Sequence, residues 1–195
     1  MTRALFALAL TAVGASAQQT ATLPFGQEAR AFKVKDVMKD EETWVDLAAF
    51  KGKNPVVLVW ISKQCDVTWR YEGRTGELLK EFGPKGVKFF AVWSSQADSA
   101  PSIRKYAESK NYVMPVLDDD KGELARHFGV GNTPTYVVLD KDFKFRYRGA
   151  CDDLQTSLGG FEAEASTAKA RYVHDALSCI LEGKEPPVAE KKGIG

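Results

Sequence analysis

The sequence predicts an α/β protein with a central sheet that is covered by helices on both faces. Residues 56–61 form a continuous apolar run, Val-Val-Leu-Val-Trp-Ile, which is typical of a strand buried on both faces. Strand-like runs then alternate with helical patterns, which indicates a parallel sheet. A chain of 195 residues is also long enough to bury its own core as one domain, without help from disulfides or metals.

The N-terminal residues have the pattern of a secretory signal peptide. Arg3 supplies a positive charge, residues 4–14 are apolar, and Ala15-Ser16-Ala17 is a small-residue cleavage site. The apolar run is too short to span a bilayer, which takes about 20 residues. We therefore expect export and cleavage rather than a membrane anchor in the mature chain, and divide the sequence into a signal peptide (1–17), a flexible leader (18–27), one folded domain (28–184) and a C-terminal tail (185–195).

The folded domain is predicted to begin with a hairpin, strands 31–37 and 44–47 around a charged turn at 39–42. After the buried strand, the pattern turns helical over 66–82, where Gly73 and Gly76 interrupt its apolar face, and a Gly-Pro-Lys-Gly segment ends it. The remaining predicted elements are strand 87–93, helix 101–110, strand 112–117, helix 122–128, strands 136–139 and 144–148, and helix 166–181. Pro186-Pro187 is expected to end the ordered part.

Composition excludes several classes of function. The chain has 27 basic and 26 acidic residues with the signs interspersed, which gives no electrostatic footprint for nucleic acid or an anionic membrane. Its three cysteines, Cys65, Cys151 and Cys179, are too few and too widely spaced for a disulfide framework or a zinc site. The two histidines, His127 and His174, make no metal-ligand pattern with each other.

Cys65 is the residue most suited to chemistry, because it lies where the buried strand ends and the next helix begins. A thiol at a helix N-terminus is close to unpaired backbone N–H groups and to the positive end of the macrodipole, which favours the thiolate. Lys63 would add to this effect and the adjacent Asp66 would oppose it. The alternative is that Cys65 is a small, half-buried packing residue with no chemistry.

Segments spread over nearly the whole chain carry a family resemblance. They are Val56 to Ile61 leading into Cys65, Tyr71-Glu72, Lys80-Glu81-Phe82 with Pro84 to Val87, Pro115 to Asp118, Thr133-Pro134, Tyr147-Arg148-Gly149 with Asp152-Asp153, Leu181 to Lys184, and Lys192 to Gly195. In order and spacing, the chain resembles the thioredoxin-like redoxins of the alkyl hydroperoxide reductase and thiol-specific antioxidant family, in particular an exported, peroxiredoxin-like branch. The resemblance implies a thioredoxin-like fold, with a central mixed sheet flanked by helices and an N-terminal β-hairpin extension.

The motif around Cys65 departs from the family patterns in three ways. Ser62 occupies the place of the attacking cysteine of a Cys-x-x-Cys site, so disulfide exchange between two thiols within the motif is excluded. Compared with peroxiredoxins, Ser62 fits the Thr or Ser that precedes the peroxide-attacking cysteine, but Leu58 replaces the family's proline and the activating arginine has no counterpart. Arg146 or Arg148 could in principle reach the site in its place. Finally, Asp66 replaces the proline usual at that position, where it can start the helix or affect the thiol.

For Thr133-Pro134, the resemblance implies a cis peptide bond beside the active thiol, with the backbone of Thr133 free to pair with an extended substrate; a trans proline at the start of a strand is the alternative. We assign Thr133, Pro134, Lys63 and Gln64 to substrate binding.

The other two cysteines have different predicted roles. Cys151 is in a segment with no apolar periodicity, where we expect it to be exposed and a candidate resolving thiol for Cys65. Cys179 is on the flank of the apolar stripe of the last predicted helix, which favours packing.

The sequence leaves three functional hypotheses. The first is an exported thiol oxidoreductase, periplasmic or extracellular, in which the Cys65 thiolate attacks a peroxide or a disulfide and an external thiol or Cys151 resolves the product. Ser62 would orient the thiolate or the peroxide. No cofactor is needed, because sulfur carries the electrons. The alternatives are a thioredoxin-fold binding module without turnover, and a disulfide reductase that works with an external thiol.

Overall fold

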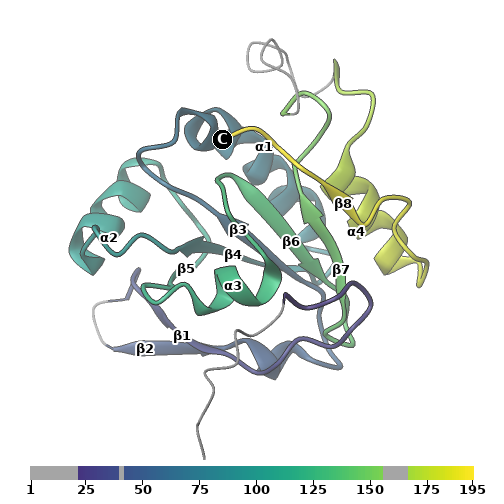
Figure 1. The fold of residues 1–195 in the computed structure, drawn as a ribbon, viewed down its shortest axis with the longest axis horizontal. Coiled ribbons are helices and arrows are strands. Elements are labelled where there is room, and N and C mark those ends of the chain that lie inside the picture. Colours follow the sequence, from purple (N-terminus) through teal and green to yellow (C-terminus); the bar gives the residue numbers. More distant parts are fainter. Residues whose placement is uncertain (1–21, 40–41, 156–166) are drawn as a thin grey trace, which may run out of the picture.

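The computed structural model describes residues 22–39, 42–155 and 167–195 (Figure 1). The signal peptide predicted over 1–17 and the first residues of the leader, 18–21, are outside these ranges. Within them, no helix is both long and apolar enough to cross a membrane.

A mixed sheet of eight strands forms the centre of the described part of the chain, in the order β2-β1-β5-β4-β3-β6-β7-β8 (Figure 1). The strands are β1 (Lys33–Asp36), β2 (Thr43–Asp46), β3 (Val56–Trp60), β4 (Lys88–Trp93), β5 (Val116–Asp118), β6 (Thr135–Leu139), β7 (Phe145–Gly149) and β8 (Glu190–Lys191). The central strand β3 is parallel to β4 and antiparallel to β6, which confirms a mixed sheet. The predicted hairpin is also confirmed, as β1 and β2 pair antiparallel.

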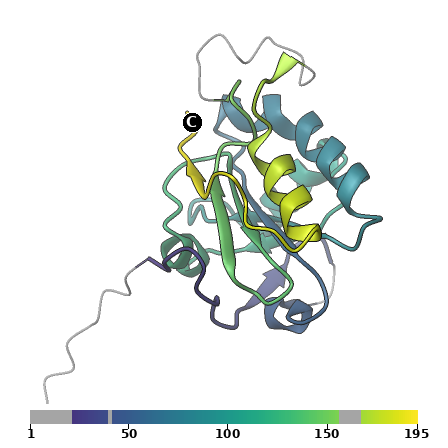
Figure 2. The same ribbon diagram turned by 90° about the vertical axis from the view of Figure 1, so that its right-hand side faces the viewer.

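Helices cover both faces of the sheet (Figure 2). They are the short 3-10 helix η1 (Leu47–Phe50) and the α-helices α1 (Asp66–Phe82), α2 (Ala100–Ser109), α3 (Glu123–Phe128) and α4 (Tyr172–Leu181). Side chains of α1, α2 and α4, such as Phe82, Ile103 and Leu177, form one core with alternate residues of the strands. On the opposite face, Leu124 and Phe128 of α3 form a second core with the other set of strand residues. Two such cores explain why every residue of β3 is buried.

Two predicted elements begin later than expected. The strand predicted from residue 112 starts at Val116, because Pro115 before it has no N–H to donate to a ladder and Val113 is 82% exposed. The helix predicted from residue 166 starts at Tyr172. The backbone groups of the residues just before this helix are hydrogen-bonded to the loop after β7 and not within a helical turn. Lys169 N donates to the Asp153 carboxylate at 3.2 Å, and Asp153 N donates to Ala170 O at 3.0 Å.

The leader is not free over its described residues, 22–27, which corrects the expectation of flexibility there. Leu23 N donates to His127 O at 2.8 Å, and the ring of Phe25 stacks on Phe145 with the centroids 4.5 Å apart. These contacts hold the segment against the face of the sheet that α3 covers.

The expectation that order ends at Pro186-Pro187 is wrong. The chain continues into β8, which pairs in parallel with β7 and adds a strand to the sheet edge. Gly149 permits this approach, because a Cβ at that position would be 1.9 Å from Lys191 O. The segment expected to be a tail is therefore part of the fold.

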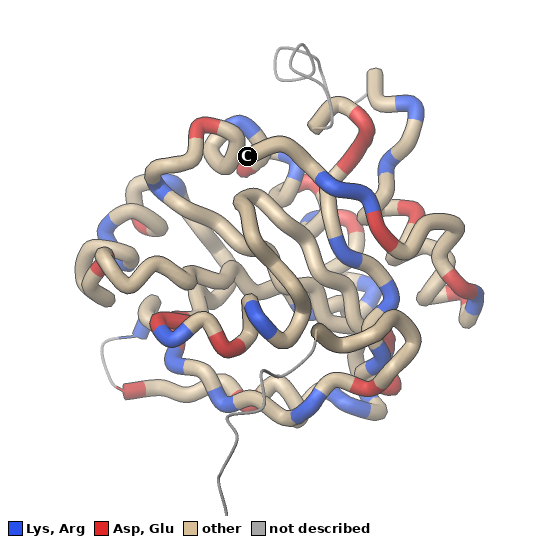
Figure 3. The backbone as a smooth tube through the Cα atoms, in the orientation of Figure 1, with Lys and Arg blue, Asp and Glu red and all other residues tan. Residues whose placement is uncertain are grey.

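Charged residues of both signs alternate along the outer parts of the chain, while the central strands carry few of them (Figure 3). This distribution agrees with the nearly balanced composition of 27 basic and 26 acidic residues.

Candidate functional site

Cys65 is the N-cap residue of α1, directly after the loop that leaves β3. Its backbone is extended (φ −101°, ψ 112°), and its carbonyl accepts a hydrogen bond from Thr68 N at 3.0 Å. The side chain is half-buried, and its Sγ donates to Thr133 O at 3.0 Å. The side chain makes no capping hydrogen bond with the backbone N–H groups of the first turn of α1.

Thr133 and Pro134 come to Cys65 from the strand beside β3. The register pairs Trp60 with Thr135, so the residues just before β6 lie next to those just after β3. The Thr133-Pro134 peptide bond is cis, as expected. Thr133 is thus in direct contact with the thiol, and Pro134 is the next residue along the chain. Both were predicted site residues, although they are far from Cys65 in the sequence.

Ser62 and Gln64 form a local hydrogen-bonded pair. Ser62 Oγ donates to Gln64 Oε1 at 2.7 Å and accepts from Gln64 N at 3.2 Å. The turn that contains them is closed by Cys65 N, which donates to Ser62 O at 3.3 Å. Ser62 is therefore adjacent to Cys65 in the turn, with its hydroxyl directed to Gln64.

Lys63 does not support the thiol in the way expected, because its ammonium group forms an ion pair with Asp98 and donates to Ser102 Oγ at 2.9 Å. Asp98 follows β4 and also accepts from Trp93 Nε1 at 3.1 Å and from Gln64 Nε2 at 3.4 Å. Burial alone would raise the pKa of this carboxyl, but the hydrogen bonds, that of Lys63 first, outweigh burial and hold the pKa below its ordinary value. Asp98 thus neutralises the charge of Lys63 and fixes the loop ahead of Cys65.

Cys65 opens onto a pocket of about 790 Å³ whose other walls come from α3 and from the loop before β6. Among its lining residues are Ser62, Gln64, Arg126 and Gly195. The guanidinium of Arg126 donates to Lys121 O at 2.7 Å.

The two arginines that the sequence suggested for this site are engaged elsewhere. Arg146 pairs with Asp140 and Glu185, and Arg148 donates to Glu190 at 3.0 Å and to Phe128 O at 2.8 Å. Arg126 is therefore the arginine that lines the pocket, and sequence reasoning missed it.

A second, smaller pocket of about 280 Å³ borders Pro134 and is lined by residues of α1 and of the segment 110–114. Gly73 and Gly76 line it, and a Cβ at either would meet nothing within 4 Å. This explains why the apolar face predicted for α1 is interrupted at these two glycines: the face borders a hollow there.

Cys151 is buried, which corrects the expectation that it is exposed. Its side chain is among the core residues, with a relative exposure of 6%, and its backbone N donates to Gln155 Oε1 at 2.8 Å. Burial, and after it the neighbouring Asp152 carboxylate, raises the pKa of the Cys151 thiol to about 12. A thiol that is both buried and protonated at neutral pH is poorly suited to attack an oxidised Cys65. Cys179, on α4, is half-buried.

We expect Cys151 to make the fold less stable in alkali. Its folded-state pKa is raised above the unfolded value of about 8.5, so its stabilising contribution is complete below that pH and is lost as the pH rises toward about 12. Between about pH 7 and about pH 10, the free energy of unfolding measured in urea should fall by about 2 kcal/mol more in the wild type than in Cys151→Ala. Equal losses in both proteins would contradict this account of Cys151.

Asp98 and Arg126 had a signal in the sequence that could have identified them. Asp98 follows the carboxyl end of β4, and Arg126 is on the helix that follows β5. Strand β4 runs parallel to β3, and β5 runs parallel to β4, so the carboxyl ends of all three strands lie at the same edge of the sheet. Ligands of open α/β sheets bind at the carboxyl ends of the strands, so polar residues of these connections are candidates. Gly195 had no such signal.

The chain is similar in sequence to thiol-disulfide oxidoreductases. It is 30% identical over 124 residues to thiol-disulfide oxidoreductase ResA of Bacillus thuringiensis subsp. konkukian (strain 97-27), a match that covers 63% of this chain and 67% of that protein.

Two solved structures are also similar. An uncharacterized conserved protein from Geobacillus kaustophilus has a TM-score of 0.73 at 28% identity, covering 86% of this chain and 87% of that one. The reduced 2-Cys peroxiredoxin of Plasmodium vivax has a TM-score of 0.54 at 19% identity, covering 64% of this chain and 83% of that one. These likenesses agree with the thioredoxin-like fold expected from the sequence.

The AhpC/TSA family matches residues 25–148, a range that includes β1 to β6, the Cys65 turn and the cis Thr133-Pro134 bond. On this match, which spans more than half of the sequence, the chain belongs to the AhpC/TSA family.

Proposed function

We propose that the protein is an exported thiol oxidoreductase with peroxidase-like character and Cys65 as its reactive group. The observation that carries the proposal is the half-buried Cys65 thiol at the N-terminus of α1, open to a pocket. Helix N-termini stabilise an anionic sulfur, and the thiolate is the nucleophile. Export rests on the signal pattern of residues 1–17.

The reaction needs one protein thiol and an external thiol reductant. The Cys65 thiolate attacks one oxygen of a peroxide: an S–O bond forms, the O–O bond breaks, and the leaving oxygen takes a proton, which yields a sulfenic acid and water or an alcohol. An external thiol then attacks the sulfenic sulfur and releases water, leaving a mixed disulfide. A second external thiol regenerates Cys65 and leaves as a disulfide. The burial of Cys151 favours an external thiol as the resolving group.

The chain's own groups would assist at defined points. Thr133 O accepts from the resting thiol at 3.0 Å and holds the sulfur toward the pocket. Gln64, fixed by Ser62 and Asp98, is on the pocket wall, and Arg126 supplies a positive charge there. We assign Thr133, Pro134 and Gln64 to the walls of the substrate site, with Lys63 supporting the loop through Asp98.

A second candidate function is disulfide reduction with an external thiol. It is favoured by the 30% identity to thiol-disulfide oxidoreductase ResA. In this case the Cys65 thiolate attacks a disulfide sulfur: a new S–S bond to Cys65 forms, the substrate's S–S bond breaks, and one substrate thiolate leaves. An external thiol then attacks this mixed disulfide and releases the second substrate thiol. Another external thiol regenerates Cys65 and leaves as a disulfide. The two functions share the same nucleophile and differ in the oxidant.

The experiment that tests the proposal measures sulfenic acid at Cys65. The reduced full chain is treated with one equivalent of hydrogen peroxide, trapped with dimedone, and digested for mass mapping, with Cys65→Ala as the control. We expect Cys65 to be oxidised at least about a hundredfold faster than free glutathione, which places it among activated thiols. Rapid reaction with oxidised glutathione and slow reaction with peroxide would support the second candidate instead. If peroxide and oxidised glutathione both react with Cys65 no faster than with a free thiol, both enzymatic functions are contradicted. The thioredoxin-fold binding module without turnover is then the remaining hypothesis.

A further inference from the structure

The C-terminal residues 190–195, called here the C-terminal strap, cross from the sheet edge to the start of α1. Figure 1 shows the chain leaving β8 and ending near the N-terminal end of α1, and Figure 2 shows the same segment outside β7. The strap thus connects the edge of the sheet with the turn that carries Cys65.

Contacts along its length hold the strap in place. Arg148 N donates to Ala189 O, just before the strap, at 3.0 Å, and Ala150 N, just after β7, donates to Lys191 O at 2.7 Å. These bonds fix the start of the strap along β7. Glu190 accepts from Arg148 Nε at 3.0 Å. Further on, Asn132 Nδ2 donates to Gly193 O at 3.4 Å.

Gln155 links the strap to the residues beside the thiol. Its side chain is fully buried, and its Nε2 donates to Pro134 O at 2.7 Å, while its backbone O accepts from Ile194 N at 3.3 Å. A Cβ on Gly193 would be 2.7 Å from the same Nε2, so the strap is packed closely against this side chain. The strap and the cis-proline loop are therefore held by one shared residue.

The end of the strap lies against the reactive site itself. A Cβ built on Gly195 would be 1.8 Å from Thr133 O and 3.6 Å from Cys65 Sγ. The Thr133 carbonyl therefore faces the thiol and is in contact with the strap, and Gly195 also lines the pocket onto which Cys65 opens. Any polypeptide that approached Cys65 along Thr133 would have to displace residues 193–195.

The strap lines the pocket beside the thiol but does not fill it. The other walls of this pocket include short or polar groups, among them Ser62, Gln64, Ser94, Gly131 and Arg126. A small oxidant can enter this pocket without moving the strap.

From this arrangement we infer that the C-terminal strap determines the substrate class of Cys65: it admits small oxidants, such as peroxides and low-molecular-weight disulfides, and excludes polypeptide disulfides. The inference rests on the proposed function of Cys65 and narrows it. The strap forms one wall of the site. Because Gly195 has no side chain, its backbone can lie directly against the carbonyl of Thr133.

Alkylation with two reagents of the same chemistry tests the inference. Cys65 is reacted with iodoacetamide and with a polyethylene-glycol iodoacetamide, and its modification is followed by mass mapping. At about pH 9.5, above the reference thiol pKa of about 8.5, the rates report access rather than activation. The variant is Gly195→Val, whose side chain cannot fit against the backbone of Thr133. Lys192→Val is the matched control, because it places the same side chain at an exposed position of the same strap.

We expect Gly195→Val to increase the rate at which the large reagent modifies Cys65 by at least about tenfold, which corresponds to about 1.4 kcal/mol in the free energy that holds the strap against the site. The rate with iodoacetamide should change less than twofold. A chain truncated after Ala189, with its fold checked by circular dichroism, should show the same selective gain. An equal gain for both reagents, or no gain in either variant, would overturn the inference. The rate of sulfenic acid formation with hydrogen peroxide is measured in parallel, so a failure of the proposed function is seen separately from a failure of the strap.

Discussion

Ser62→Cys is expected to convert the site into a two-thiol disulfide reductase. Residues 62 to 65 form a tight turn, closed by Cys65 N donating to Ser62 O at 3.3 Å, which brings the two positions within range of a disulfide. An intramolecular thiol has an effective concentration far above that of an external thiol. The rate at which the protein reduces a low-molecular-weight disulfide such as oxidised glutathione, with dithiothreitol as the electron donor, should therefore rise by at least about a hundredfold.

Ser62→Ala is the matched control, because it removes the same hydroxyl and its contacts with Gln64 without adding a thiol. We expect it to leave the reduction of oxidised glutathione at the wild-type level. Mass mapping of the oxidised Ser62→Cys protein should find residues 62 and 65 joined. Two free thiols after oxidation would contradict the turn geometry described here.

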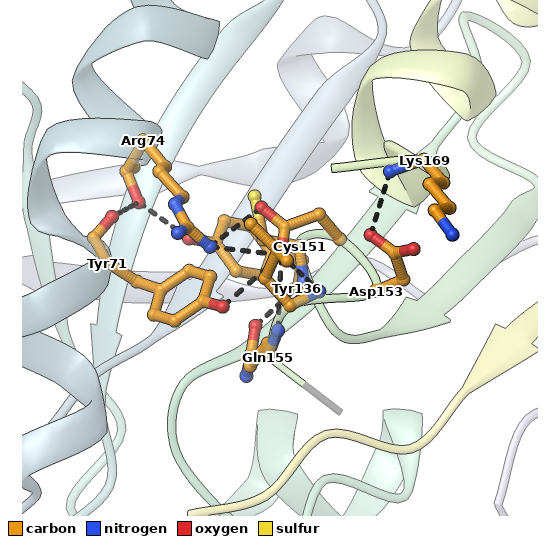
Figure 4. Close-up of polar contacts among 10 residues, drawn as sticks. Tyr71, Arg74, Tyr136, Cys151, Asp153, Gln155 and Lys169 are labelled. Carbon is orange, nitrogen blue, oxygen red and sulfur yellow. Dashed lines mark hydrogen bonds and ion pairs between the residues drawn. The ribbon is translucent and has the colours of Figure 1, made fainter. Parts of the chain in front are cut away.

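Loss of the buried carboxylate of Asp152 should destabilise the fold strongly. Arg74 Nη1 donates to both oxygens of Asp152, at 3.0 and 2.9 Å, and their side chains are only 10% and 5% exposed. Tyr71 OH also donates to Asp152 at 3.2 Å, so α1 and the loop after β7 are joined here. Figure 4 shows Tyr71 and Arg74 of α1 beside Cys151, the residue before Asp152. In Asp152→Ala, the Arg74 guanidinium stays in the interior without its carboxylate, which costs about 3–5 kcal/mol. Urea unfolding measures this loss.

Asp142→Ala provides the control for Asp152→Ala. Asp142 is an exposed carboxylate paired with Lys141 on the surface, where solvent screens the pair, so its loss should leave the free energy of unfolding almost unchanged. Replacing both buried partners, in Arg74→Met combined with Asp152→Leu, should recover most of the lost stability, because no charge is then left inside. A loss below about 1 kcal/mol in Asp152→Ala would mean that water reaches this pair.

Local sequence patterns were sufficient for most of the fold. The apolar run at 56–61 predicted a strand buried on both faces, and β3 is buried at every residue. The helix predicted over 66–82 has those bounds in the structure. Both depend on neighbouring residues alone: on hydrophobic periodicity and on the Gly-Pro segment that stops the helix. Two elements start later than predicted, β5 because Pro115 before it has no N–H to donate and α4 because the loop of Asp153 uses the backbone groups ahead of it. The pairing of β8 with β7 was not predicted at all.

The candidate site was predictable only in part. Cys65 follows from its position between a strand and a helix, which the sequence displays directly. Its contact with Thr133 O joins residues 68 positions apart, and it exists because β6 pairs with β3 in one register. The pairing of Lys63 with Asp98 depends in the same way on β4 lying next to β3. Such contacts are set by the order of strands in the sheet.

By itself, the sequence determined the α/β class, the central strand and the thiol at the start of α1, because these depend on patterns that neighbouring residues create. Only the tertiary structure decided that Cys151 is buried and that residues 190–195 reach Cys65. The burial of Cys151 results from the packing of α1, β6 and α4 around a loop with no pattern of its own. The position of the strap results from an open sheet edge at β7 and from Gly149, whose missing side chain lets the backbone of Lys191 approach.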